Sequence, residues 1–205
     1  MNAVVTPIGR VELPEVVIRF PDLFTATQIN NEGEFKFRAN FVFSPNSKAF
    51  KIAEAAHLAV ATDKWKGNAA NVIRSLSKDK NSLRNGDDQL AKDGSIRNGY
   101  EGMKFVAATS KTAPLVVAAS RIDPNTGRLK IYLTERDKDD QAIYDCAIVN
   151  AKVEFYAMEK EKIGKGIFCT LRGVQFVRDG KNFSGSRPAA LDEFAALATE
   201  DDPLG

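Results

Sequence analysis

The sequence predicts a mostly β protein with some α-helix, in which strands close into a Greek-key β-barrel with a helical insertion. Residues 34–43 and 149–157 alternate apolar and polar side chains, the period of two of a strand with one buried face. Residues 48–66 carry apolar side chains at helical spacing, which predicts a helix between strands. The end of the chain is acidic, which predicts a flexible acidic tail.

The N-terminal part predicts two strands. Residues 1–14 are expected to form an arm of low order, and residues 16–20 a first strand that Pro21 ends. A polar turn over residues 25–33 leads into the second strand, residues 34–43, which has the clearest alternation in the chain. Its predicted core row is Phe35, Phe37, Ala39, Phe41 and Phe43.

The helix over residues 48–66 has both a start and a stop signal. Ser47 or Asn46 is the expected N-cap, and Gly67 ends the helix. The only tryptophan, Trp65, stands between two lysines at this end. Two interpretations remain open for it: a plug of the core, or a stacking platform at the mouth of a groove.

The middle of the chain mixes a loop with short elements. A second short helix is expected over residues 68–77, followed by a long loop over residues 78–99 that has no apolar period. Apolar strands are predicted over residues 103–109 and 115–120, and a strand with one polar face over residues 128–135.

A hairpin of two strands and a charged turn is predicted over residues 148–177. Each arm has an apolar row that should face the core, and Gly173 suggests a bulge that bends the last strand. Cys146 and Cys169 match no CxxC spacing and fall in predicted strands. Buried reduced thiols are the favoured interpretation, with a bridge between facing strands as the alternative.

Aromatic rings and cations recur together on the predicted exposed faces. Bases stack on rings and phosphates pair with cations, so this pattern is typical of a surface that binds single-stranded nucleic acid. The predicted phosphate contacts are Lys36, Arg38, Lys64, Lys66, Arg84, Lys130, Lys152 and Arg172. The predicted stacking residues are Trp65, Tyr132, Tyr156 and Phe168. The alternative is that the rings are ordinary cross-strand partners, or are covered by another element.

The sequence offers little for catalysis, and we expect no enzyme, no cofactor and no metal. His57 lies on or beside the apolar stripe of the helix, without a flanked nucleophile, which favours a structural imidazole. The acids at 87–88 and 137–140 lie in loops rich in Lys and Asn, so solvated charge explains them. Phosphate-binding glycine motifs are missing. No apolar run approaches the ~18 residues of a membrane span, and we expect no secretion signal.

Charge is distributed unevenly along the chain. Residues 1–187 contain all 29 Lys and Arg but only 22 of the 27 Asp and Glu, a net charge of +7. Residues 188–205 begin with an amphipathic segment and contain five acids. We therefore expect one domain over residues 1–187 that attracts polyanions, and a tail that competes for the same groove or recruits partners. The alternative is an ordinary surface excess of positive charge.

Several stretches, taken in order, resemble the bacteriophage single-stranded DNA-binding proteins with an OB-fold core. They span roughly residues 16–185 and read RFPDLF, FRANFVFSPNS, SLRNGDDQ, YEGMKFVAATS, YDCAIVNAKVEFYA and GIFCTLRGVQFVRDGKNF. The OB-fold is a five-stranded Greek-key barrel that binds oligonucleotides on its outer face. We expect its helix to lie between the third and fourth strands.

This resemblance implies sequence-tolerant binding of exposed single strands during phage DNA replication, recombination or repair, in the cytoplasm of the infected bacterial host. It also implies an acidic end that contacts replication or recombination proteins. The residues expected in that contact are Glu200, Asp201, Asp202, Pro203 and Leu204. The chain ends in Leu-Gly without a terminal Phe, unlike the bacterial type of tail.

Two other functions compete with this one. A phage structural or assembly protein would use the same aromatic face to bind a protein partner. A nuclease or annealing accessory would use Asp87 and Asp88 with a metal ion.

Overall fold

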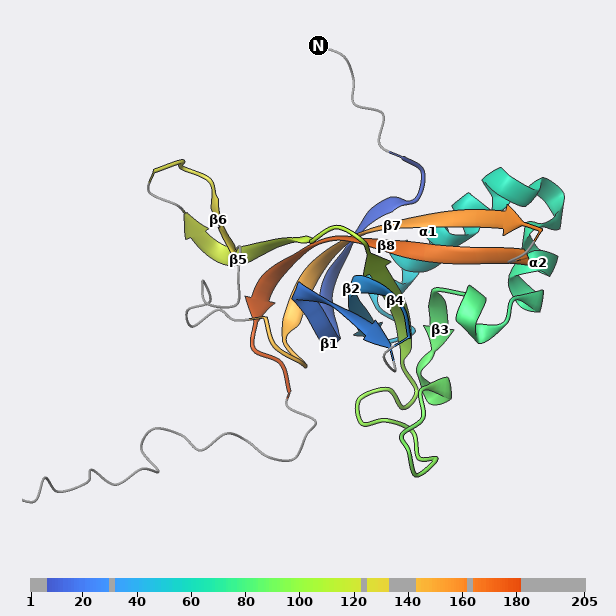
Figure 1. Cartoon of the computed structure of the whole chain (residues 1–205), viewed down its shortest axis with the longest axis horizontal. Helices are drawn as coiled ribbons and strands as arrows, with labels where there is room; N and C mark the ends of the chain where they lie inside the picture. Colours follow the sequence, from blue (N-terminus) through green and yellow to red (C-terminus); the bar gives the residue numbers. More distant parts are fainter. Residues whose placement is uncertain (1–6, 30–31, 123–124, 133–142, 162–163, 182–205) are drawn as a thin grey trace, which may run out of the picture.

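Five strands close into a barrel in the computed structural model, which describes residues 7–29, 32–122, 125–132, 143–161 and 164–181. The barrel strands are β1 (Arg10–Ile29), β2 (Glu32–Phe43), β4 (Lys104–Ser110), β7 (Ile148–Lys160) and β8 (Gly164–Arg178). Hydrogen-bonded neighbours follow the order β4, β2, β1, β7, β8 (Figure 1). A parallel pairing of Thr109 with Thr170 joins β8 back to β4, so the predicted OB-type barrel is confirmed.

The remaining elements extend or cover the barrel. They are α1 (Lys48–Trp65), α2 (Ala69–Ser75), β3 (Leu83–Asn85), β5 (Leu115–Ile122) and β6 (Leu129–Tyr132), with 3₁₀ turns η1 (Lys66–Asn68), η2 (Lys78–Lys80) and η3 (Gly86–Asp88). The strand β5 pairs in parallel with β8, and β5 and β6 project from the barrel on the side opposite the β7–β8 hairpin end (Figure 1). The predicted place of the helix was wrong, because α1 lies between the second and third barrel strands, β2 and β4.

The helix α1 begins where the sequence predicted. The Ser47 hydroxyl accepts the Phe50 backbone N–H at 3.1 Å, which makes Ser47 the N-cap. Small residues on one side of α1 enter the barrel core: Ala49, Ala53, Ala56, Val60 and Ala61. His57 is also buried, with its Nε2 2.8 Å from the Asn81 Oδ1, and burial lowers the pKa of its imidazole. These contacts fit the structural role expected for His57.

The first strand is longer than predicted. Residues 16–20 are only the middle of β1, which continues through both Pro14 and Pro21. The ladder with β7 shifts register around Pro14, and the ladder with β2 shifts around Pro21. Beside them, Glu15 and Phe20 have φ of 48° and 50°. Proline is tolerated at such bulges because no ladder N–H is needed there, so these prolines bend the strand and do not end it.

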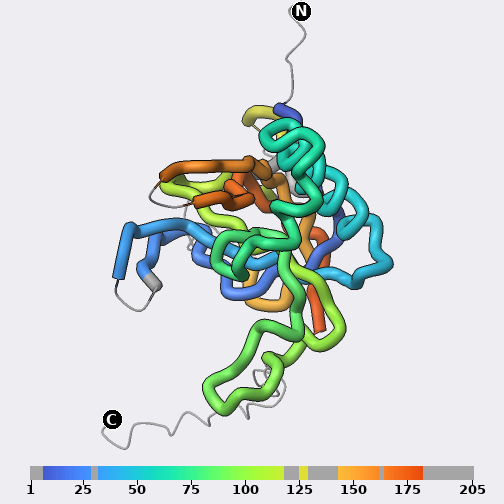
Figure 2. Tube along the Cα trace, turned by 90° about the vertical axis from the view of Figure 1, so that its right-hand side faces the viewer, coloured from blue at the N-terminus to red at the C-terminus, as the bar shows by residue number. Residues whose placement is uncertain are grey.

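The hairpin of β1 and β2 extends beyond the barrel, on the side away from α1 (Figure 2). Most of the expected turn over residues 25–33 therefore belongs to these two strands. The expected arm over residues 1–14 overlaps β1 from Arg10 onward, because residues 10–13 pair with β7. Phe35, a predicted core residue, is 63% exposed because its end of the strand has no core to face. Phe37 is half-buried, and only Ala39, Phe41 and Phe43 are buried.

The segment predicted as a long loop also contains structure. Its strand β3 pairs with β4, and the chain between them projects from the barrel as a loop before it returns to β4 (Figure 1). There Tyr100 forms a second buried cluster with Val42 and Phe105. Part of the outer face of β2 and β4 is therefore covered by Tyr100.

Both cysteines are buried thiols that form no disulfide with each other, as the favoured interpretation held. Cys169 lies in β8, where burial raises the pKa of its thiol. Cys146 lies in the turn before β7, not in a strand. Among the described residues, neither helix has the length and apolar character required to cross a bilayer.

Candidate nucleic-acid interface

The outer face of the β7–β8 hairpin carries a pair of aromatic rings. The predicted alternation is present in both strands, so the rows of Val153 and Leu171 face the core. Tyr156 and Phe168 are directly opposite each other in the ladder and face outward. Their ring centroids are 5.8 Å apart at an interplanar angle of 34°, and Tyr156 is 44% exposed. The pair offers an exposed aromatic surface on which a base can stack.

Gly166 determines how the Phe168 ring lies. A Cβ atom added at Gly166 would be 2.6 Å from the Phe168 Cε2, closer than real contacts allow. The ring therefore lies against the bare backbone of Gly166, two residues earlier in the same strand. A side chain at this position would displace the ring from the strand surface.

The cations on this face are balanced by carboxylates. Lys152 forms an ion pair with Glu12 on β1. Arg172 and Arg10 both bind the Glu154 carboxylate, at 2.6 Å and 3.0 Å. Burial alone would raise the pKa of Glu154, but the hydrogen bonds and charges of Arg10 and Arg172 outweigh it and lower that pKa. The group of two arginines and one glutamate keeps a single positive charge.

The outer face continues from the hairpin to β2. The pairing of Thr109 with Thr170 joins β8 to β4, and Thr109 is also the ladder partner of Arg38 on β2. Thr170 lies between Phe168 and Arg172 along β8. The structure therefore brings predicted residues of β2 and of the hairpin onto one curved surface.

The two predicted cations of β2 are also ion-paired. Lys36 Nζ lies 3.5 Å from the Glu34 carboxylate. Arg38 Nε lies 3.6 Å from the Asp22 carboxylate, and its Nη2 donates to the Thr27 carbonyl at 2.5 Å. Arg38 is the more buried of the two, so it is held firmly beside the surface that it would offer to a phosphate.

The end of α1 meets the end of the same hairpin. The indole N–H of Trp65 donates to the Glu159 Oε2 on β7 at 2.8 Å, and the ring is half-buried against the core. This contact places the end of α1 beside the hairpin. Lys66 pairs with Asp63 at 3.4 Å, whereas Lys64 is exposed and has no ion-pair partner within the described part of the chain. A stacking role for Trp65 stays a prediction.

Arg84 lies elsewhere, in a cleft of about 850 Å³ between α1, α2 and β3. Its Nε donates to the Asn81 carbonyl at 2.6 Å, and burial lowers the pKa of its guanidinium. The structure therefore groups Arg84 with the helices and not with the aromatic pair.

Several predicted residues cannot be placed. The backbone of β6 contains Lys130 and Tyr132, with Tyr132 opposite Val116 on β5, but their side chains are not described. The five tail residues lie outside the described residues: Glu200, Asp201, Asp202, Pro203 and Leu204.

The acids proposed for a metal-dependent alternative have other partners. Asp87 accepts the Gly102 backbone N–H at 2.7 Å, and Asp88 pairs with Lys78 at 2.6 Å. In the part of the chain that the structure describes, no group of three or more His, Cys, Asp or Glu side chains could hold a metal ion.

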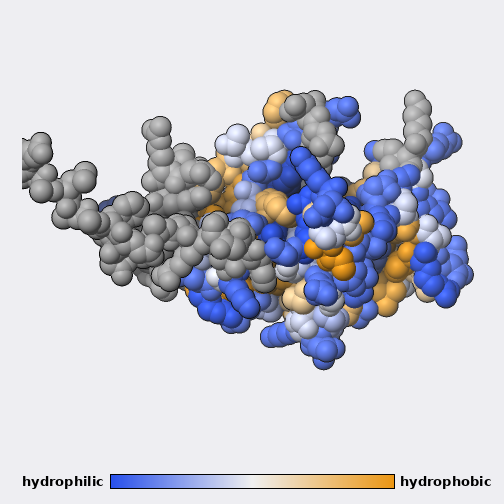
Figure 3. All heavy atoms as spheres, turned by 90° about the horizontal axis from the view of Figure 1, so that it is seen from below, coloured by the Kyte–Doolittle hydropathy of each residue, from blue (hydrophilic) through white to orange (hydrophobic). Residues whose placement is uncertain are grey.

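Exposed hydrophobic side chains are dispersed. Seen from below in Figure 3, hydrophobic patches of the described residues are separated by hydrophilic surface. The large exposed ones are Ile8, Phe20, Phe35, Leu58, Leu90, Ile96, Leu115, Tyr144 and Tyr156. Single rings within a polar surface suit stacking of separate bases better than the docking of a broad apolar partner.

The sequence reasoning missed one aromatic cluster on the outer face. Phe20 of β1 stacks on Tyr100, and the guanidinium groups of Arg19 and Arg97 lie near its ring. The members come from segments some 80 residues apart, so no local alternation connects them. The only local signal is the proline after Phe20, which marks the bulge.

Comparisons with known proteins agree with this architecture. A family model described as "Enterobacter phage Enc34, ssDNA-binding protein" matches residues 9–204. Putative protein p50 of Acyrthosiphon pisum secondary endosymbiont phage 1 is 36% identical over 198 residues, which cover 94% of this chain and 96% of that protein.

Two solved structures share the fold. The single-stranded DNA-binding protein of bacteriophage Enc34, in complex with ssDNA, aligns with a TM-score of 0.64 and 17% identity, over 86% of this chain and 90% of that chain. The single-stranded DNA-binding protein gp2.5 of bacteriophage T7 aligns with a TM-score of 0.50 and 8% identity, over 96% of each chain. Since the family model spans nearly the whole sequence, this chain belongs to the family of the phage Enc34 single-stranded DNA-binding protein.

Proposed function

We propose that this chain binds single-stranded DNA, without a strong sequence preference, on the outer face of its barrel. The observation that carries the proposal is the outward-facing pair of exposed Tyr156 and half-buried Phe168, beside the Arg10, Arg172 and Glu154 group. Rings supply stacking to any base, and cations attract any phosphate, so this chemistry is sequence-tolerant. Membership of the family and the names of its relatives support the same conclusion.

The proposed path follows the surface that OB-folds use. Oligonucleotides bind the second and third strands of an OB-fold and the adjoining loops. In this chain those strands are β2 and β4, and the adjoining hairpins are β1–β2 and β7–β8. Phosphates would contact Lys36, Arg38, Lys130, Lys152 and Arg172, with Lys64 and Lys66 at the rim. Bases would stack on Tyr132, Tyr156 and Phe168, and on Trp65 at the end of α1.

Existing ion pairs do not prevent phosphate binding. Exposed pairs such as Lys152–Glu12 contribute only ~0–1 kcal/mol. A phosphate that approaches Lys152 can therefore replace Glu12 at small cost. The carboxylates would keep the face closer to neutral until a polyanion arrives.

Membership of the family supports a proposal for the biological setting. We infer a non-catalytic role in phage DNA replication, recombination or repair, in the cytoplasm of the infected host. The acidic tail, including Glu200, Asp201 and Asp202, would contact replication or recombination proteins and compete with DNA for the basic face. Deletion of residues 199–205 should then tighten binding of oligo-dT at low salt, and weaker binding would contradict competition by the tail.

A mobility shift assay tests the central proposal. Single-stranded DNA, duplex DNA and RNA of equal length should be compared at two salt concentrations. We expect single-stranded DNA to bind most tightly, with affinity falling as salt rises. If the protein shifted none of these nucleic acids at either salt concentration, the result would instead favour a phage assembly protein that uses the aromatic face to bind a protein partner.

Variants locate the site in the same assay. Tyr132→Ala and Phe168→Ala should each weaken binding by about 5- to 150-fold, the equivalent of ~1–3 kcal/mol for one stacked base. Leu58→Ala is the matched control, because Leu58 is 48% exposed on α1, outside the proposed path. Equal affinity of wild type and Tyr132→Ala would remove Tyr132 from the site.

A further inference from the structure

Phe20 presents an exposed ring from a strained position of the backbone. It follows Arg19 in β1 at the bulge before Pro21, with a φ of 50°. Positive φ is unusual for a bulky residue that is not glycine. The side chain is nevertheless 41% exposed, so burial of the ring does not explain why the chain adopts this conformation. Strain of this kind persists where surrounding contacts hold it, and it often accompanies function.

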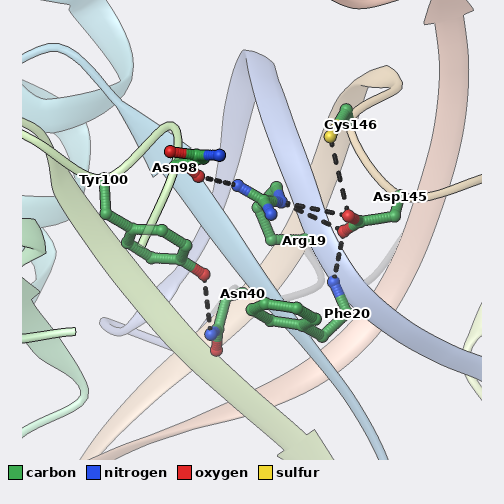
Figure 4. A network of polar contacts seen from close by, with 7 residues as sticks. All are labelled: Arg19, Phe20, Asn40, Asn98, Tyr100, Asp145 and Cys146. Atoms are coloured by element: carbon green, nitrogen blue, oxygen red, sulfur yellow. Dashed lines mark hydrogen bonds and ion pairs between the residues drawn. The ribbon is translucent and has the colours of Figure 1, made fainter. Parts of the chain in front are cut away.

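Two distant segments hold Phe20 in place. The Asp145 Oδ1 accepts the Phe20 backbone N–H at 2.7 Å, and the same carboxylate accepts the Arg19 Nε at 3.1 Å. From the other side, the Arg19 Nη1 donates to the Asn98 carbonyl at 2.5 Å. Figure 4 shows the Arg19 guanidinium between Asn98 and Asp145, with Phe20 beside it. The bulge is thereby fixed by the turn before β7 and by the segment that leads into β4.

The ring itself lies on a rigid support. Phe20 stacks on Tyr100 with centroids 6.5 Å apart and planes 12° from parallel. Tyr100 is fully buried, and its hydroxyl accepts the Asn40 Nδ2 at 3.0 Å (Figure 4). Burial raises the pKa of Tyr100 to about 12, so the hydroxyl stays neutral. One face of Phe20 is therefore supported while part of the ring remains exposed to solvent.

Two guanidinium groups lie over this ring. The Arg19 Cζ is 5.1 Å and the Arg97 Cζ is 5.3 Å from its centroid. Asp145 balances the charge of Arg19. Arg97 donates from Nε to the Leu90 carbonyl at 3.1 Å and has no carboxylate partner within the described residues. An exposed ring beside an uncompensated arginine combines the two groups that one nucleotide needs, a stacking surface and a phosphate contact.

The cluster lies across the barrel from the Tyr156–Phe168 pair. Arg19 pairs with Asn40, and Asn40 pairs with Ala107. The Ala107 N–H then donates to the Ser82 carbonyl, and the Ser82 N–H donates to the carbonyl of Ile167, the neighbour of Phe168. Four hydrogen-bonded steps of about 4.8 Å each connect the two sites, or about 19 Å along the curved surface of the barrel. A single strand that crosses this distance uses several nucleotides, within the ~4 to 16 that an OB-fold occupies.

We propose that Phe20 is a second base-stacking residue, at the opposite end of the DNA path from Tyr156 and Phe168, with Arg97 as its phosphate contact. This inference rests on the proposed function. It adds to the site a stacking residue that the alternation of apolar and polar residues along the strands did not indicate. Asp145 and Tyr100 act as positioning residues, since they hold the bulge and the ring and do not face the ligand.

Phe20→Asn separates this role from a structural one. Asn tolerates positive φ, so the bulge should be kept while the ring is lost. We expect oligo-dT binding to weaken by about 5- to 150-fold, the range for one stacked base, with an unchanged midpoint of thermal unfolding. Unchanged affinity in Phe20→Asn, with wild type still binding oligo-dT, would overturn the inference and leave the proposed function intact. If wild type itself failed to bind, both would fall.

A fluorescence experiment gives an independent answer. In a double variant with Phe20→Trp and Trp65→Phe, the only tryptophan is at position 20, so its fluorescence reports on the surroundings of that position. We expect its emission to be quenched as oligo-dT binds, with a midpoint that matches the affinity measured by anisotropy. Emission that stays constant while anisotropy shows binding would overturn the inference, whatever the stability of Phe20→Asn. Arg97→Gln should flatten the logarithmic dependence of affinity on salt by about 0.7, the value for one phosphate on a single strand.

Discussion

Two aromatic sites on one barrel are built in different ways. Tyr156 and Phe168 belong to adjacent strands of a regular ladder, and their exposure follows from alternation along the chain. Phe20 belongs to a bulge and Tyr100 to the segment that leads into β4, and their stacking depends on contacts between distant residues. The first site is specified by local pattern, whereas the second is specified by the assembled fold.

The two sites also differ in how their charge is balanced. At the hairpin, Arg10 and Arg172 share Glu154 in an exposed arrangement that DNA can compete with. At the bulge, Arg19 is buried and its pairing with Asp145 fixes geometry, which leaves Arg97 for a phosphate. We infer that the hairpin supplies adjustable contacts and that the bulge supplies a rigid one.

The largest expected effect comes from removing the hairpin rings together. Tyr156→Ala combined with Phe168→Ala should weaken oligo-dT binding at least ~30-fold, because two stacks of ~1–3 kcal/mol are lost. Fluorescence anisotropy at constant salt measures it, with Leu58→Ala as the control. A double variant that binds oligo-dT as tightly as wild type would mean that the hairpin is not part of the DNA-binding site. The comparison of the hairpin with the Phe20 bulge as two DNA-binding sites would then be wrong.

A smaller effect should follow from Gly166→Ala. The added Cβ would clash with the Phe168 ring at 2.6 Å and displace it, while both rings remain in the chain. We expect affinity to fall by about 5-fold, the low end for one stack, in the same anisotropy assay. Combination with Phe168→Ala should add nothing further, since the displaced ring is then absent; an additional loss would contradict this mechanism.

Glu154→Gln sharpens the comparison of charges. The change leaves Arg10 and Arg172 without their carboxylate, so both become available to phosphates. We expect tighter binding at low salt and a logarithmic salt dependence that is steeper by about 0.7 for each added phosphate contact. Asp145→Asn should behave in the opposite way, because it loosens the support of Phe20 and weakens binding. Weaker binding of Glu154→Gln would show that this carboxylate positions the arginines and does not mask them.

The smallest effect concerns acid stability. The pKa of Glu154 is below its ordinary value of 4.5 in the folded protein, so its ion pairs contribute stability that is complete above pH 4.5. That stability is lost as pH falls through the lowered folded pKa. Thermal unfolding of Glu154→Gln should therefore depend less on pH below 4.5 than that of wild type. Identical pH profiles would contradict the role of these ion pairs.

The sequence predicted those parts of the fold in which local pattern decides. Alternation identified both rows of the β7–β8 hairpin, and the N-cap residue located the start of α1. Prediction from the sequence failed where the hydrogen-bond ladder between strands is irregular. The sequence predicted Pro14 as the end of an arm and Pro21 as the end of a strand, because the bulges at these prolines show only in the pairing with the partner strands. Phe35 looked like core because alternation cannot show where the barrel ends.

The candidate site shows the same limit. Tyr156, Phe168 and Arg172 could be selected from their places in one hairpin, but their shared Glu154 could not be weighed without the structure. Arg84 was predicted as a cation at the rim of the groove, and the structure places it in the cleft beside α1 and α2. Phe20 was not selected at all, since its support, Tyr100, follows it by 80 residues.

A titration followed by nuclear magnetic resonance tests directly whether both sites lie on one DNA path. Amide and aromatic signals should be recorded while oligo-dT is added in a short form, which spans one site, and in a longer form, which spans about 19 Å. We predict that the longer form shifts the signals of Phe20 and Phe168 with a common midpoint, and leaves Leu58 on α1 unchanged. The account would be contradicted if only one ring responded to the longer form, or if the main changes fell in the cleft between α1, α2 and β3.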